Sequence, residues 1–180
     1  MLNRFVLFLP LFAVVISLSM IMNYALSKDP TQLASPLIDM PLPEFSEVDV
    51  LHPDQTITKE SLLGQSYLVN VWASWCAECV REHQMWVELQ KEHPFKLVGV
   101  LYSDKTAHVL PWLSSEGNPY TSLIDDPQGH TMISFGAYGT PETLLVDAHG
   151  FIIKRFLGPI SRKDWSEIIL PELDHVNSNH

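Results

Sequence analysis

An uncharged apolar run near the N-terminus divides this chain into two parts. The run covers residues 5–26, lies between Arg4 and Lys28, and contains no Asp, Glu, Lys or Arg among its 22 residues. As a helix it would be about 33 Å long, which matches the hydrocarbon core of a bilayer. The sequence therefore predicts one N-terminal transmembrane helix followed by a separate polar domain.

The length of the run favours an uncleaved anchor over a cleavable signal peptide, whose apolar stretch covers roughly 7–15 residues. Ala25 can belong to a cleavage site, so cleavage stays open as an alternative. A buried core helix explains the run poorly, because only Ser17, Ser19 and Asn23 interrupt it. Arg4 is the only charged side chain before the run, which favours an N-terminus inside the cell and an exported domain.

We therefore expect an N-terminal tip and anchor over residues 1–30, a linker over 31–43 and a domain over 44–180. The linker is predicted from its prolines and its lack of hydrophobic periodicity. The chain of 180 residues has 11 Lys and Arg against 21 Asp and Glu, a net charge of −10. Without residues 1–30 it keeps 9 basic and 20 acidic residues, a net charge of −11. Such a domain repels phosphate backbones, which excludes nucleic-acid binding, and it favours partners with basic patches.

Apolar runs typical of buried strands alternate with helical patterns across the domain. Strands are predicted at residues 66–73, 95–102, 142–147 and 151–157, and helices at 77–92, 105–116, 127–135 and 161–173. A Gly-containing turn at 148–150 joins the last two strands as a hairpin, and Pro171 is expected to fray the last helix. Strands that alternate with helices and end in a hairpin indicate an α/β fold with a central mixed β-sheet flanked by helices.

The two cysteines of the chain, Cys76 and Cys79, lie where the first of these strands ends and the longest helix begins. At a helix N-terminus, unpaired backbone N–H groups and the positive end of the helix dipole favour a thiolate over a thiol at Cys76. Cys79 follows one turn later, where its sulfur can attack a mixed disulfide formed by Cys76. Cys76 is therefore the candidate nucleophile and Cys79 the candidate resolving thiol.

A structural disulfide or a metal site fits the cysteine pair less well. A structural disulfide that closes four residues would contribute only about 2 kcal/mol in the loop-closure model. A metal site of Cys76, Cys79 and His83 lacks a second cysteine pair, whereas structural zinc usually has four protein ligands. Trp75 beside the pair also indicates a surface that docks a peptide. The pattern thus favours thiol–disulfide exchange.

The segment Trp72-Ala73-Ser74-Trp75-Cys76-Ala77-Glu78-Cys79 resembles the active-site segment of the thioredoxin superfamily. More narrowly, the chain resembles the membrane-anchored thiol–disulfide proteins of cytochrome c maturation, the CcmG/DsbE group. Further similar segments, within a resemblance that covers about residues 30–175, are 35–38, 68–72, 81–83, 117–120 and 136–143. The resemblance implies a thioredoxin-like fold and a redox-active disulfide between Cys76 and Cys79, with no other cofactor and no metal.

The resemblance also implies roles for individual residues. Pro141 matches a proline that is cis in thioredoxin-like proteins, and the backbone of Thr140 can pair with an extended substrate. Trp75 and Glu142 complete the implied substrate-binding set. Glu82 matches an acid that tunes the thiols and relays a proton, since a nearby carboxylate raises a thiol pKa. From the residues alone, an ordinary trans proline at 141 and a solvated acid at 82 stay open alternatives.

Other residues in and near the motif also allow predictions. Glu78 departs from the Pro-Thr or similar pair that is more usual in the family, and it also fits simple helix capping. Asn70 stands where classical thioredoxins have a buried acid, so Glu82 is the expected substitute. His83 is expected to be a packed histidine rather than a ligand. The segment 117–120 carries no chemical argument of its own and is a loop by composition.

The expected function is that of a periplasmic reductant in cytochrome c maturation, tethered to the inner membrane with its domain facing the periplasm. The resemblance implies apocytochrome c or its haem-ligation partner as the client, and a DsbD/CcdA-type membrane reductase as the electron donor. Two alternatives stay open: a broad-range disulfide oxidase or isomerase, and a non-catalytic metal or haem chaperone that uses Cys76, Cys79 and His83.

Overall fold

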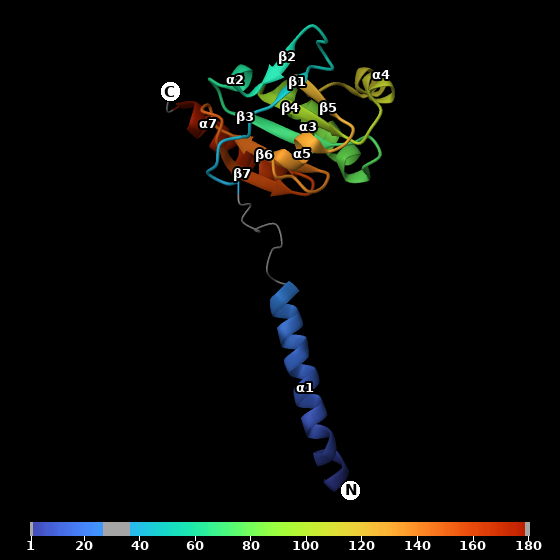
Figure 1. Cartoon of the computed structure of the whole chain (residues 1–180). Coiled ribbons are helices and arrows are strands. Elements are labelled where there is room, and N and C mark those ends of the chain that lie inside the picture. Colours follow the sequence, from blue (N-terminus) through green and yellow to red (C-terminus); the bar gives the residue numbers. More distant parts are fainter. Residues whose placement is uncertain (1, 27–36, 179–180) are drawn as a thin grey trace. The chain divides into compact units, whose positions relative to one another are not determined.

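A computed structural model describes residues 2–26 and 37–178 of the chain. The chain divides into two units, residues 1–33 and 34–180. The first unit contains helix α1 (Leu2–Leu26), drawn in blue in Figure 1. A search of the described residues finds no helix whose length and apolar character would let it cross a membrane. Residues 31–36 of the expected linker lie outside the described residues.

The second unit is built around a five-stranded mixed sheet with the order β5-β4-β3-β6-β7 (Figure 1). Its strands are β3 (Tyr67–Trp72), β4 (Lys96–Tyr102), β5 (Ser122–Asp126), β6 (Glu142–Val146) and β7 (Ile152–Leu157). β3 is parallel to β4 and β4 to β5, whereas β6 is antiparallel to both β3 and β7. Every residue of β3 and β6 is buried. This arrangement confirms the predicted mixed α/β sheet.

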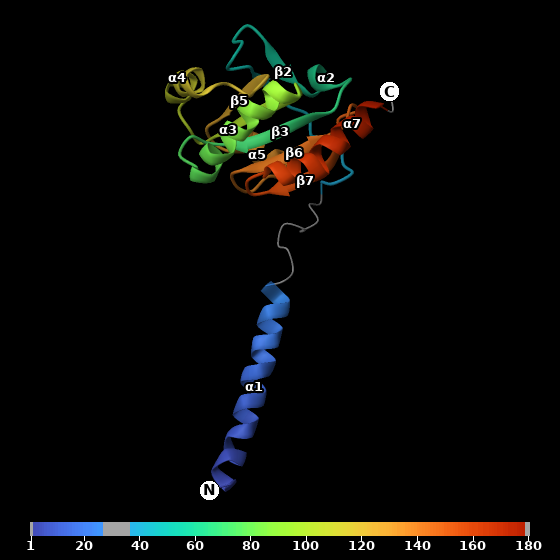
Figure 2. The same cartoon turned by 180° about the vertical axis from the view of Figure 1, so that it is seen from behind.

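The helices cover both faces of the sheet. They are α2 (Lys59–Leu62), α3 (Ala77–Glu92), α4 (Thr106–Glu116), α5 (His130–Ser134), α6 (Arg162–Asp164), the π-helix η2 (Trp165–Ile169) and α7 (Leu170–Ser178). Because side chains alternate along a strand, Leu68 and Trp72 pack under α3 and α4 on one face, and Val69 and Val71 pack on the opposite face with α5. Figure 2 shows α3 and α7 in front of the sheet on the first of these faces.

Several parts of the domain differ from the sequence-based expectation, among them the short helix α2, which was not predicted. β5 was not predicted, and the helix expected over 127–135 is the shorter α5. The last helix continues to Ser178 instead of fraying at Pro171. Pro171 lies at the second position of α7, which continues directly from η2, and the preceding turn widens so that Leu170 N–H donates to Trp165 O.

The domain also begins before the expected linker ends at residue 43. Asp39 N–H donates to Ile152 O at 2.8 Å, and Leu42 N–H donates to Gly150 O at 2.7 Å. The Leu42 side chain is fully buried in the core. Residues 39–42 therefore belong to the folded domain rather than to an extended linker. A small hairpin of β1 (Ser46–Val48) and β2 (Thr56–Thr58) follows them.

Candidate active site

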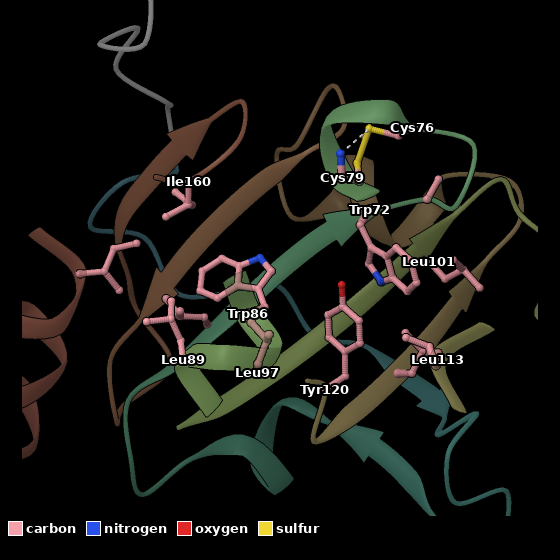
Figure 3. Packing of buried hydrophobic residues seen from close by; sticks show 14 of the residues in the cluster. Trp72, Cys76, Cys79, Trp86, Leu89, Leu97, Leu101, Leu113, Tyr120 and Ile160 are labelled. Carbon is pink, nitrogen blue, oxygen red and sulfur yellow. Dashed lines mark hydrogen bonds between the residues drawn. A yellow bond between two sulfur atoms is a disulfide. The ribbon is translucent and has the colours of Figure 1, made fainter. Parts of the chain in front are cut away.

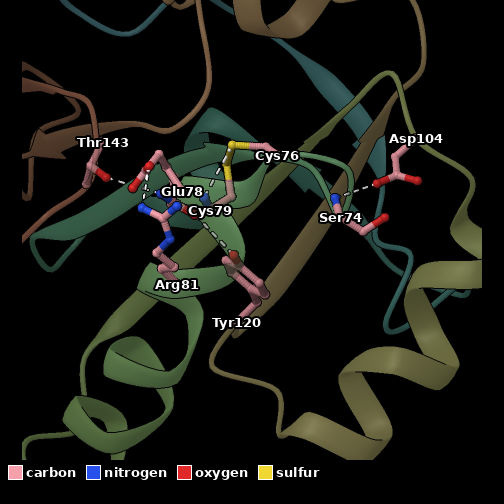
Figure 4. Close-up of a disulfide and its surroundings, with 9 residues drawn as sticks. Ser74, Cys76, Glu78, Cys79, Arg81, Asp104, Tyr120 and Thr143 are labelled. Atoms are coloured by element: carbon pink, nitrogen blue, oxygen red, sulfur yellow. Dashed lines mark hydrogen bonds and ion pairs between the residues drawn. A yellow bond between two sulfur atoms is a disulfide. The ribbon is translucent and has the colours of Figure 1, made fainter.

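The cysteine pair lies where the central strand of the sheet passes into α3. Cys76 is the N-cap of α3, and its Sγ accepts a hydrogen bond from Cys79 N–H at 3.2 Å. The two residues form a disulfide with their Cα atoms 5.3 Å apart (Figure 4). Cys76 is 8% exposed and Cys79 is 4% exposed. The bond therefore lies at the surface end of a buried cluster, with the Cys76 sulfur at the helix N-terminus that favours its thiolate.

The loop before β6 lies at the same edge of the sheet. β6 runs antiparallel to β3 with Glu142 opposite Val71, so the chain enters β6 where β3 ends. The Thr140–Pro141 peptide bond is cis. Thr140 is partly exposed and Tyr138 is largely exposed. The structure thus brings together the cysteines and the segment that the resemblance assigned to substrate binding.

Trp75 is held in an exposed position beside the cysteines. Its side chain is 59% exposed, its Nε1–H donates to Ser103 O at 3.0 Å, and its ring makes an edge contact with Tyr102. The neighbouring Ser74 N–H donates to Asp104 Oδ2 at 2.6 Å (Figure 4). The loop before Cys76 is therefore fixed by the segment that follows β4.

Ser103 and Asp104 were missed as site residues in the sequence. A usable signal existed, because they directly follow the strand predicted at residues 95–102, which the structure places beside β3. The carboxyl ends of parallel neighbouring strands meet at one edge of a sheet, which is where α/β proteins place their sites.

Glu82 is buried in α3, one turn after Cys79. It is 4% exposed, and neither carboxylate oxygen meets a hydrogen-bond partner in good geometry. Burial raises the pKa of Glu82 to about 8, although the Trp86 side chain and the Ile160 backbone oppose this shift. The alternative of a solvated helix acid is wrong. A carboxyl group that is mostly protonated at neutral pH can give or take a proton during exchange.

Asn70 belongs to a buried chain of hydrogen bonds beneath the site. Tyr120 Oη–H donates to Asn70 Oδ1 at 3.0 Å, and Asn70 Nδ2–H donates to Thr143 Oγ1 at 3.1 Å. The Tyr120 ring stacks on Trp72, with 5.1 Å between ring centroids, and its hydroxyl points toward the end of the sheet that carries the disulfide (Figure 3). The segment 117–120, which had no chemical argument in the sequence, therefore supplies a buried partner to Asn70.

His83 is a packed side chain, as expected. It is 1% exposed, Nε2–H donates to Gly117 O at 2.9 Å, and the ring packs against Trp112 with 4.3 Å between centroids. Burial lowers the pKa of His83, which favours the neutral ring. Among the residues that the structure describes, no group of three or more His, Cys, Asp or Glu is placed to hold a metal ion.

Glu142 does not add an acid to the substrate-binding face, and that expectation is corrected. Its side chain is 5% exposed, and Oε2 forms an ion pair with Arg155 Nη2 at 2.7 Å. Oε1 accepts the N–H groups of Tyr138 and Gly139, each at 2.8 Å. The carboxylate therefore faces inward and holds the loop before β6.

Glu78, between the two cysteines, lies on the surface in the first turn of α3. It forms an ion pair with Arg81 at 2.6 Å, and both side chains are well exposed. An acid at this position interacts favourably with the helix dipole, which agrees with a capping role. Figure 4 shows the pair beside the disulfide.

Comparison with known proteins agrees with this geometry. The family model described as Redoxin matches residues 38–169. The chain belongs to the Redoxin family. Within the family it is 42% identical over 156 residues to the thiol:disulfide interchange protein DsbE of Allochromatium vinosum, covering 87% of this chain and 86% of the relative. It is 38% identical over 178 residues to the probable thiol:disulfide interchange protein DsbE-2 of Pasteurella multocida, covering 99% and 93%.

Solved structures show the same thioredoxin-like fold for this Redoxin-family chain. A thiol:disulfide interchange protein of the thioredoxin family from Chlorobium tepidum matches with a TM-score of 0.62 and 27% identity, covering 74% of this chain and 95% of that one. The relatives and the CxxC spacing together identify a thiol:disulfide oxidoreductase of the DsbE group. Cys76 and Cys79 form the disulfide of its CxxC pair.

Proposed function

We propose that this protein is a reductant of disulfides in cytochrome c maturation. Its clients are apocytochrome c or the haem-ligation protein that holds the haem-binding cysteines, and a DsbD/CcdA-type membrane reductase restores its dithiol. The proposal is supported by the resemblance to the CcmG/DsbE group over most of the chain and by the relatives named DsbE. Since the periplasm is kept oxidising kinetically, such a dithiol needs an external source of electrons.

In this proposal residues 1–30 anchor the protein in the inner membrane, and the domain faces the periplasm. The 22-residue uncharged run supports an anchor, and Arg4 before it supports an N-terminus inside the cell. The anchor keeps the domain close to a membrane-bound reductase.

The proposed exchange proceeds in two balanced steps. The Cys76 thiolate attacks one sulfur of the client disulfide, which forms a mixed disulfide and releases the first client thiolate. The Cys79 thiol then loses its proton, and the resulting thiolate attacks Cys76 Sγ and releases the second client thiolate. Two electrons pass from the dithiol to the client, and the two protons of the dithiol go to the client thiols. In its ionised form, the buried Glu82 can accept the Cys79 proton, because it lies three residues later on the same helix.

The observation that carries the proposal is the position of Cys76. It caps α3 beside the loop before β6, where N–H groups stabilise a thiolate and partly exposed Thr140 can receive an extended client. A structural disulfide would not need this placement.

The test is adduct capture in cells with the Cys79→Ser variant. The variant keeps Cys76 but cannot release the client, so a mixed disulfide is expected to accumulate and to identify the client by mass spectrometry. Cys76→Ser is the matched control and should give neither adduct nor exchange. If Cys79→Ser accumulates no mixed disulfide under any redox condition, the assigned roles of the cysteines are wrong.

The reduction potential separates this function from that of an oxidase. A reductant requires a strongly reducing pair, whereas a value near −120 mV would identify a DsbA-like oxidant. Equilibration of the purified protein with glutathione buffers gives this value directly.

A further inference from the structure

A buried cation lies behind the loop that precedes β6. Arg155 is in the edge strand β7, and only 6% of its side chain is exposed. Its Nε donates to Glu142 Oε2 at 2.8 Å, and its Nη2 forms an ion pair with the same oxygen at 2.7 Å. β6 and β7 pair with Leu144 opposite Arg155, so Arg155 and Glu142 are diagonal neighbours on one face of the sheet.

Hydrogen bonds from the loop backbone connect this ion pair to the surface. The second oxygen of Glu142 accepts the N–H groups of Tyr138 and Gly139, each at 2.8 Å. The Arg155 guanidinium also lies over the Tyr138 ring, 4.8 Å from its centroid. Tyr138 is nonetheless 68% exposed. Arg155 is thus connected to the exposed Tyr138 in two ways, through Glu142 and by direct contact with the ring.

The other end of the loop is fixed as well. Gly158 N–H, just after β7, donates to Pro141 O at 3.0 Å. Residues 138–141 are therefore held at both ends, and they enter β6 at the edge of the sheet where the cysteines lie.

A buried ion pair of this kind is not explained by stability alone. Replacement of such a pair by packed apolar residues is often neutral or stabilising, because the free energy needed to remove two charges from water is about as large as the free energy of their attraction. A carboxylate that accepts two backbone N–H groups does something that an apolar pair cannot do. It fixes the direction of the loop, provided that a cation keeps the carboxylate charged and in place.

We propose that Arg155 is a positioning residue for client docking: through Glu142 and the Tyr138 ring it holds residues 138–140 in the conformation that receives the client beside Cys76. This inference rests on the proposed function, since it assumes a peptide client that docks on this loop. Arg155 touches neither the client nor the sulfur atoms. Its effect is expected on docking and not on the redox chemistry.

The experiment compares two oxidants of the reduced full-length protein in detergent. One is a short peptide with a CxxC disulfide, and the other is hydroxyethyl disulfide, which has no peptide backbone to dock. Arg155→Met is expected to react with the peptide roughly ten- to a hundredfold more slowly, which is the cost of misplacing a bound reactant by about 1 Å. Its rate with hydroxyethyl disulfide and its reduction potential should stay at the wild-type values.

Lys154→Met is the matched control. Lys154 is the neighbouring residue of β7, and it also forms an ion pair, with Glu172 at 2.7 Å, but it is 40% exposed. The control variant loses one cation and one ion pair, and both rates should be unchanged. Arg155→Lys keeps the charge but loses the planar two-point contact, so it should show a smaller loss confined to the peptide. If Arg155→Met does not fold, the Lys variant decides the question in the same assay.

The inference is overturned if the Arg155 variants react with the peptide as fast as the wild type, or if both oxidants slow by the same factor. A wild-type protein that cannot reduce the peptide at all would overturn the proposed function, and this inference with it. A wild type that reduces the peptide, with variants that do so equally well, would overturn only the role of Arg155.

Discussion

Two glutamates are buried on the elements that border the disulfide, and their surroundings give them different chemistry. Glu142 has a cation, Arg155, and two backbone N–H groups around its carboxylate. Glu82 has no such partners, and its burial raises its pKa to about 8. A paired carboxylate serves to hold a loop, whereas an unpaired one near neutrality serves to exchange protons.

The pKa of Glu82 gives a first prediction for stability. An unfolded chain titrates this group near the ordinary value of 4.5, whereas the oxidised folded protein keeps its proton up to about pH 8. Between these two values the unfolded state binds fewer protons, so the free energy of unfolding falls as the pH rises and levels off above the folded pKa. Relative to the wild type, Glu82→Gln should therefore gain about 3 kcal/mol between pH 5 and pH 8.

Urea unfolding of the oxidised protein at several pH values measures this difference. Glu78→Gln, on the exposed surface of the same helix, is the control and should follow the wild-type pH dependence. Parallel curves for Glu82→Gln and the wild type would show that Glu82 has no raised pKa in the folded protein.

The residues of the site differ in how well the sequence predicts them. Cys76 and Cys79 were found because their spacing is a local signal, whereas Pro141 was assigned only through the family resemblance. The roles of Tyr120 and Glu142 were not found, since each depends on a partner brought near by the fold. Tyr120 bonds to a residue 50 positions away, and Glu142 to one 13 positions away on the next strand. Spacing along the chain carries no signal for such pairs.

Among the secondary-structure elements, β5 depends most on its surroundings. Only two of its residues, Leu123 and Ile124, are apolar, so it has too short an apolar run to be read as a strand. Asp49 completes its edge: Oδ1 accepts the N–H groups of Leu123 and Leu51, each at 3.0 Å. Val50 N–H also donates to Leu123 O at 2.8 Å. A buried side chain from the β1–β2 hairpin thus supplies bonds that a further strand would otherwise supply.

We predict that Asp49→Ala lowers the free energy of unfolding by about 3 kcal/mol, because it leaves the buried N–H of Leu123 without its charged acceptor. Asp54→Ala, in the exposed turn of the same hairpin, is the control and should change stability by no more than about 0.5 kcal/mol. Denaturant unfolding at neutral pH measures both. Equal effects of the two substitutions would show that Asp49 does not hold the edge of the sheet.

The long elements and the short strand β6 were predicted well, whereas the short elements α2, β1, β2 and β5 were not. β3, β4 and α3 carry continuous apolar runs or a helical period, so their own residues indicate them. The segment 162–178 was harder, because Pro171 normally ends a helix. The buried side chains of Trp165 and Leu173 on either side of it keep the chain helical through a wider turn. Tertiary packing, which a local pattern does not contain, decides such cases.

For the molecule as a whole, the proposed anchor leads to a test in cells. We predict that the full chain stays with the membrane fraction after an alkaline carbonate wash, whereas a version restricted to residues 34–180 and exported by a cleavable leader is released. The mass of the full-length product distinguishes an uncleaved anchor from a cleaved leader. A product shortened at Ala25 would identify a signal peptide and contradict the anchor.

The charge of the domain should control which clients reach it quickly. Its net charge of −11 creates a field that attracts basic segments and repels acidic ones before any contact forms. We predict that the rate constant for a CxxC peptide flanked by lysines falls by about tenfold as sodium chloride rises from low to physiological concentration, because salt screens the attraction. The same peptide flanked by glutamates should react faster as salt is added. Since both peptides share one disulfide, opposite salt responses separate steering from the chemistry of exchange, and parallel responses would show that the acidity of the domain does not select its clients.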